Sequence, residues 1–177
     1  MKGPFSAYPL LLLLVSCGSE NGRTTTSAAE LEACQLLPAA EVGRLMGEPV
    51  TKSDNTIQMS AVSQCVHTLS EPRERLTVLV RNSNGGIPPL SRAQQAAQER
   101  AQDDSGAGET LAAAIEAGED IDGLGDFAYA FELGGSQLWV FWDQNYFMTI
   151  TVSGADDHAA ALIVAKEAAQ IVIDQTQ

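Results

Sequence analysis

The strongest constraint on the fold is an alternation of side-chain character near the end of the chain. Large apolar side chains alternate with small or polar ones over residues 127–133, and two more apolar runs follow at 138–142 and 146–153. Gly134-Gly135-Ser136 and Asp143-Gln144-Asn145, which are residues typical of turns, separate the three runs. A period of two is typical of strands whose two faces differ. The segment therefore predicts an antiparallel meander of three strands.

The rest of the chain adds weaker strands and several helices. Strands are expected over residues 50–58, 61–69 and 76–81. Helices are expected over residues 39–47, 91–102, 111–115 and 158–174. This order of elements predicts an α+β fold, a single domain with an antiparallel sheet and about three helices. The two halves are candidates for a diverged repeat, each with a helix and a meander.

Two of these helices have recognisable ends and faces. Pro38 suits the first position of the first helix, and Gly47 is placed to end it. Asp156 and Asp157 can cap the last helix. The apolar stripe that we expect the last helix to bury consists of Leu162, Ala165, Ala169 and Val172.

The N-terminus has the pattern of a secretory signal. Lys2 is followed by the apolar run Leu10–Val15 and by small residues that close on Cys17. The run is much shorter than the roughly 20 apolar residues that a helix needs to cross a bilayer. We therefore expect residues 1–16 to be removed as a signal peptide.

Leu14-Val15-Ser16-Cys17 resembles the lipobox of bacterial lipoproteins. The resemblance implies a diacylglyceryl group on Cys17, which would become the first residue after cleavage. The alternative is an ordinary secretory signal with Cys17 present by chance. Residues 17–30 then form a lipidated flexible tether, because they are rich in Gly, Ser and Thr, and residues 31–177 form one globular domain.

In Gram-negative lipoproteins an Asp directly after the lipidated Cys retains the protein in the inner membrane, and here that position is Gly18. The resemblance therefore implies a lipid-anchored protein of the cell envelope. In a Gram-negative cell it would lie on the periplasmic face of the outer membrane or on the cell surface.

Two internal motifs resemble a family of small bacterial envelope lipoproteins of unknown function. The first is Cys34-Gln35-Leu36-Leu37 with a helix that ends in Gly47, followed by a second Cys, Cys65, on a strand. The second is Ile121-Asp122-Gly123-Leu124-Gly125-Asp126, which leads into the meander. These motifs are structural, so the resemblance implies a fold and transfers no chemistry.

Cys34 and Cys65 are the cysteines that remain beside Cys17. In an exported chain two such thiols are more often bridged than free, so we expect a disulfide between them. The alternative is a metal or catalytic thiol. His67 stands two residues after Cys65, on the same face of an expected strand, and that spacing would permit a Cys/His pair.

The charge of the chain is strongly acidic and unevenly distributed. It holds 23 Asp and Glu against 10 Lys and Arg, which makes nucleic acid and anionic lipid headgroups poor partners. Residues 101–177 contain fourteen acidic residues and one basic residue, Lys166. This half favours a cationic protein, a polycation or divalent ions as a partner, and the alternative is that the charge serves solubility alone.

The common catalytic and metal-binding motifs do not occur in the sequence. It lacks a Gly-x-Ser-x-Gly elbow, a phosphate-binding loop and a His-Glu-x-x-His motif. The aspartates of 120–126 do not follow the spacing of an EF-hand, so we expect this segment to be a structural lead into the meander. The prediction is a binding or structural module with no catalytic residue, cofactor or metal. The alternative is an envelope hydrolase that uses a pair of carboxylates in a cleft.

The candidate binding surface is one face of the expected meander. Leu138, Val140 and Trp142 point to one side of their strand, while Trp139 and Phe141 point to the other side, joined by Phe147. A sheet in water needs only one apolar face. The second face is therefore either covered by helices, which the number of helices favours, or open to a ligand.

Overall fold

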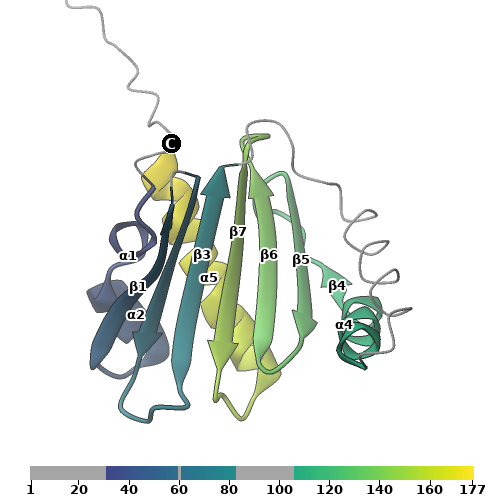
Figure 1. Ribbon diagram of the computed structural model, residues 1–177, viewed down its shortest axis with the longest axis horizontal. Coiled ribbons are helices and arrows are strands. Elements are labelled where there is room, and N and C mark those ends of the chain that lie inside the picture. Colours follow the sequence, from purple (N-terminus) through teal and green to yellow (C-terminus); the bar gives the residue numbers. More distant parts are fainter. Residues whose placement is uncertain (1–30, 60, 83–105) are drawn as a thin grey trace, which may run out of the picture.

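The computed structural model describes residues 31–59, 61–82 and 106–177. These residues form one seven-stranded sheet in the order β1-β2-β3-β7-β6-β5-β4, and every neighbouring pair is antiparallel. Figure 1 shows the sheet in front of a long helix that crosses it from behind. The predicted α+β domain with an antiparallel sheet is therefore confirmed.

The strands fall close to their predicted positions. They are β1 (Lys52–Met59), β2 (Val62–Thr68), β3 (Arg75–Asn82), β4 (Glu119–Asp120), β5 (Phe127–Glu132), β6 (Ser136–Trp142) and β7 (Tyr146–Ser153). The meander β5-β6-β7 has the turns that were expected, and β6 begins two residues earlier than predicted. The two-residue strand β4 was not predicted, because so short a run carries no periodicity.

The helices lie on both sides of the sheet. α1 (Ala33–Leu36), α2 (Ala39–Met46) and α5 (His158–Thr176) pack on one face, and α4 (Ala107–Glu116) packs on the other, beside β5. Gly47 ends α2 in a left-handed conformation, as predicted, whereas Pro38 is the N-cap residue and not the first helical residue. The helix expected over 91–102 lies outside the described residues.

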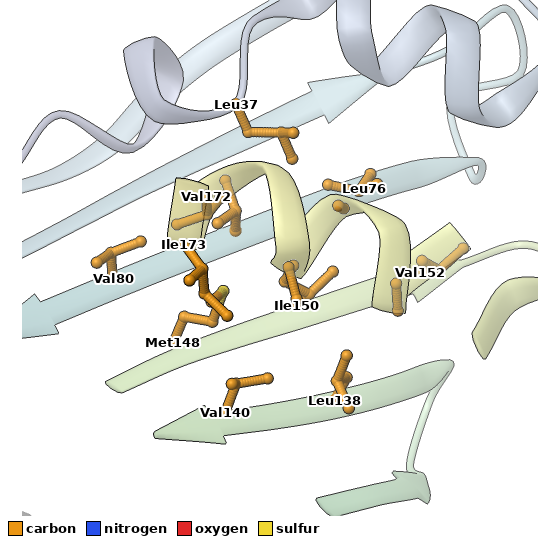
Figure 2. Packing of buried hydrophobic residues seen from close by; sticks show 14 of the residues in the cluster. Leu37, Leu76, Val80, Leu138, Val140, Met148, Ile150, Val152, Val172 and Ile173 are labelled. Atoms are coloured by element: carbon orange, nitrogen blue, oxygen red, sulfur yellow. The ribbon is translucent and has the colours of Figure 1, made fainter. Parts of the chain in front are cut away.

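The main core lies between the sheet and α5. Figure 2 shows Val172 and Ile173 of α5 among side chains from β3, β6 and β7. The four predicted stripe residues of α5 are all buried. Asp157 caps the helix by accepting a hydrogen bond from the Ala159 amide at 2.9 Å. The long helix thus covers the central strands β6 and β7 on this face, and α1 covers β1, β2 and β3.

A disulfide fixes α1 to the sheet. Cys34 and Cys65 are bonded, with their Cα atoms 5.1 Å apart, as predicted. The Ala33 amide also donates a hydrogen bond to Ser63 Oγ at 2.9 Å. Because Cys65 is bonded to sulfur, the alternative of a Cys65/His67 metal pair does not apply in this structure.

The segment 121–126 is a tight lead into β5. Gly125 has a positive φ of 63°, and a Cβ there would lie 2.4 Å from the Phe141 carbonyl oxygen. Leu124 turns into the core and is 7% exposed. The Asp126 carboxylate accepts a hydrogen bond from the Gln144 amide at 2.9 Å. These contacts fix the β6–β7 turn against the start of β5.

Each half of the domain contains a meander, β1-β2-β3 and β5-β6-β7, and the two join where β3 pairs with β7. The helices that precede them lie on opposite faces of the sheet. A common origin of the halves stays a prediction.

None of the helices in residues 31–59, 61–82 and 106–177 combines the length and apolar character needed to cross a membrane.

Candidate binding surface

A row of side chains runs across six strands on the sheet face away from α5. The strand register places each member directly opposite the next, so all six point to the same side. In strand order the row is Met59, Val62, Arg81, Phe147, Phe141 and Phe127. Neighbouring strands are about 4.8 Å apart, so this cross-strand row is about 24 Å long.

The aromatic members of the row touch one another. The ring centroids of Phe141 and Phe147 are 4.8 Å apart, and those of Phe127 and Phe141 are 6.0 Å apart. Trp139 lies two residues before Phe141 on β6 and on the same face. Its ring meets that of Phe147 edge-on, with the ring centroids 6.0 Å apart. The structure therefore brings Trp139, Phe141 and Phe147 together, as the sequence predicted, and adds Phe127 to them. All four side chains are partly buried, and Met59 at the far end is 62% exposed.

Arg81 is the single charged member of the row. Its guanidinium carbon lies 4.8 Å from the centre of the Phe147 ring, in a cation–π contact. Its Nε is buried without a hydrogen-bond partner. Among the residues that the structure describes, no carboxylate forms an ion pair with it. A partly buried guanidinium thus stands in an apolar row, and its Nε has no hydrogen-bond partner among the described residues.

α4 covers only the β5 side of this face. Ile115 packs against Tyr129 and Phe131 in a small second core, and the Tyr129 hydroxyl donates to the Ile115 carbonyl. Burial raises the pKa of Tyr129, and the nearby Asp120 carboxylate adds to that effect. The expectation that helices cover the second face is met here, and the described helices leave Phe141 and Phe147 partly exposed.

This face differs in charge from the rest of the molecule. Side chains that β2, β3, β7, β6 and β5 direct to it include two arginines, Arg75 and Arg81, and no carboxylate. On the outer strands Asp54 pairs with Lys52 at 2.7 Å, and Asp120 lies on β4. The acidic residues of 106–177 are all exposed, and on β5, β6 and β7 none lies on this face. The carboxylates of the described residues thus lie away from the centre of this surface.

Both ends of the described domain lie at the end of the sheet that carries the row. Ala33 is bonded to Ser63, next to Val62. Thr176, at the other terminus, accepts a hydrogen bond from Trp142 Nε1 at 3.0 Å, next to Phe141. Figure 1 shows the C-terminus at this end. A tether that precedes Leu31 would therefore leave the domain close to the row.

The two histidines each contact a serine. His67 Nδ1 lies 2.8 Å from Ser53 Oγ, and His158 Nδ1 lies 2.5 Å from Ser136 Oγ. No carboxylate among the described residues hydrogen-bonds to either ring, and Ser136 is only 3% exposed. His67 of β2 contacts Ser53 of β1, and His158, the first residue of α5, contacts Ser136 of β6, so each contact links two neighbouring elements. These pairs lack the third group that orients a catalytic histidine.

A pair of carboxyl groups exists at the opposite end of the sheet. Glu48 and Glu74 interact through a side-chain hydrogen bond, which raises the pKa of Glu74. The pKa of Glu48 is lowered by a side-chain hydrogen bond with Ser70 and by the bond with Glu74. Glu48 also borders an open depression of about 640 Å³ lined by Gly43, Arg44 and Pro49. Both side chains are partly exposed to solvent.

Within the described part of the chain, no three His, Cys, Asp or Glu side chains are grouped to hold a metal ion. Asp120, Asp122 and Asp126 border a depression of about 220 Å³. Leu124 fills the core side of this segment, which suits the structural role expected for it.

The sequence alone did not indicate Arg81, Met59, Val62 or Phe127 as parts of the surface. Their common row depends on the pairing of β3 with β7, which joins residues far apart in the sequence. The sequence held one signal for Arg81. It lies two residues after Leu79, so both side chains point to the same face of an apolar strand.

Comparison of the chain with protein-family models, with curated proteins and with solved structures finds no match.

Proposed function

We propose that the protein is a lipid-anchored, non-catalytic binding module of a bacterial cell envelope, with the cross-strand row and Trp139 as its binding surface. The observation that carries the proposal is the row itself, a line of partly exposed aromatic side chains next to an arginine whose Nε has no hydrogen-bond partner among the described residues. A sheet needs only one apolar face to fold, and α5 already covers the other face. Exposed apolar patches rimmed by polar residues are typical of interaction sites.

Two features support a location in the cell envelope. Leu14–Cys17 resembles a lipobox, and the Cys34–Cys65 disulfide suits an oxidising compartment. The domain would be held by the end that carries the row, because Ala33 is bonded there. A cationic partner for the acidic half stays a prediction.

Binding of the neutral, apolar dye Nile red to the full-length chain tests the surface. We expect saturable binding that weakens at least tenfold in Phe147→Ser. The matched control is Ile163→Ser, which removes a side chain that is 59% exposed on the far side of α5. Absence of saturable binding, or equal loss in the two variants, would refute the surface.

The anchor is tested by fractionation of cells that produce the wild type or Cys17→Ala. We expect the wild type in the membrane fraction and the variant in the soluble fraction, with the same thermal unfolding midpoint. Palmitate labelling that still marks the variant would rule out lipid on Cys17.

An envelope hydrolase is the second candidate, because Glu48 and Glu74 form a carboxyl pair beside a depression. Glu74→Gln would abolish such an activity. Hydrolysis of a glycoside by the wild type that is lost in this variant and kept in Glu71→Gln would favour the hydrolase over the binding module.

A further inference from the structure

We propose that the ligand of the cross-strand row is a single-chain carboxylate amphiphile, whose carboxylate is bound by Arg81 and whose hydrocarbon chain lies over Phe147, Phe141 and Phe127. This inference rests on the proposed function and names the chemistry of its ligand. It joins three observations: a guanidinium whose Nε lacks a hydrogen-bond partner among the described residues, the line of rings next to it, and the lack of carboxylates on the central strands of this face.

Arg81 determines the sign of the charge on the ligand, which should be negative. A guanidinium donates to carboxylates in a planar, two-bonded geometry, and stacking on Phe147 holds it in one orientation. A partly buried cation with no ion-pair partner among the described residues and an unsatisfied Nε is costly, so an anionic ligand gains more here than at a solvated surface. A cationic ligand would be repelled, although the chain as a whole is acidic.

The width of the row determines which kind of apolar group the ligand carries. The next row on the same face lies about 7 Å along the strands, and in it two polar side chains, Gln64 and Thr149, alternate with apolar ones. In strand order this row is Ile57, Gln64, Leu79, Thr149, Trp139 and Tyr129. A helix about 10 Å wide would bury these polar side chains as well. An extended peptide would bury its own amides over rings that cannot hydrogen-bond to them. A hydrocarbon chain is narrow and has no polar groups to satisfy, so it fits one row.

The test uses the full-length chain with Cys17→Ala, so that no attached lipid competes for the row. Dodecanoate, dodecanol and dodecyltrimethylammonium, all below their micellar concentrations, are each titrated to displace Nile red. We expect dodecanoate to bind about tenfold more tightly than dodecanol, and the trimethylammonium compound to bind most weakly. In Arg81→Met the affinity for dodecanoate should fall to that for dodecanol.

Arg75→Met is the matched control, because Arg75 lies on the same strand and face but donates to the Pro72 carbonyl. It should leave all three affinities unchanged. Equal affinities for dodecanoate and dodecanol in the wild type would overturn the proposal without any variant, while Nile red binding would still uphold the surface. Tighter binding to phosphatidylglycerol vesicles or to an acidic peptide than to dodecanoate would also overturn it. Failure of Nile red itself to bind would overturn the surface and its ligand together.

Discussion

The two faces of the sheet are built from the same strands and differ in what they bury. Toward α5 the strands direct aliphatic residues such as Leu138, Val78 and Ile150, each fully buried. Toward the other side Phe127, Phe141 and Phe147 stay partly exposed, in one row with Arg81. The first face has a cover along its whole width, and the second has α4 at β5 alone among the described helices.

Because alternate residues of one strand point to opposite faces, one set can contribute mainly to stability and the other mainly to binding. A buried aliphatic face gains free energy by excluding water and shows nothing to a partner. A partly exposed aromatic face contributes less to folding but keeps area that a ligand can cover. Substitutions confined to one face should therefore separate the two effects.

Loss of the disulfide should cost the most, because it ties α1 to the covered face. In Cys34→Ser/Cys65→Ser we expect the free energy of unfolding to fall by about 3 kcal/mol. Urea unfolding of the wild type, the reduced wild type and the double variant measures it. If two reactive thiols are found in the unreduced, denatured protein, the disulfide is absent.

Gly125→Ala tests the lead into β5, which positions Phe127 and Phe141. The positive φ and the collision with the Phe141 carbonyl oxygen should cost about 2–3 kcal/mol. Gly123→Ala is the control, since its φ is also positive but a Cβ there meets nothing within 4 Å, so we expect about 1 kcal/mol. Equal losses would mean that the contact with β6 is unimportant.

His67, on the covered face, should make the stability of the fold depend on pH. Burial lowers the pKa of His67, and the Leu37 carbonyl nearby opposes this only in part. The ring is therefore neutral when folded and takes up a proton more readily when unfolded. Stability is complete above about pH 6.5, the unfolded pKa, and falls as the pH drops toward the lowered folded pKa. His67→Gln should flatten that fall between pH 7.5 and 5.5, and an unchanged slope would assign it to other groups.

Calcium should have the smallest effect. The segment 120–126 has Leu124 in the core and Asp126 bonded to Gln144, so we expect calcium and magnesium to shift the unfolding midpoint by the same small amount through screening. A calcium-specific rise that Asp122→Asn removes would reveal a metal site instead.

Local pattern predicted most of the strands and helices that the structure describes. Alternation located β5, β6 and β7, and periodicity located the buried stripe of α5. Trp139, Phe141 and Phe147 could be grouped because they lie on adjacent strands of one meander. Arg81 could not be placed with them, because register between β3 and β7 is set by packing of the whole sheet. The same limit hid the Glu48–Glu74 pair, which joins the end of α2 to the turn before β3.

The most direct test compares two substitutions on β6, Leu138→Ala on the covered face and Phe141→Ala on the row. We expect Leu138→Ala to lose about 3 kcal/mol of unfolding free energy and to bind Nile red like the wild type. Phe141→Ala should lose about 1 kcal/mol, because its ring is partly exposed, and bind Nile red at least tenfold more weakly. If Phe141→Ala destabilises the fold as much as Leu138→Ala and leaves dye binding unchanged, both faces are structural and the row is not a binding surface.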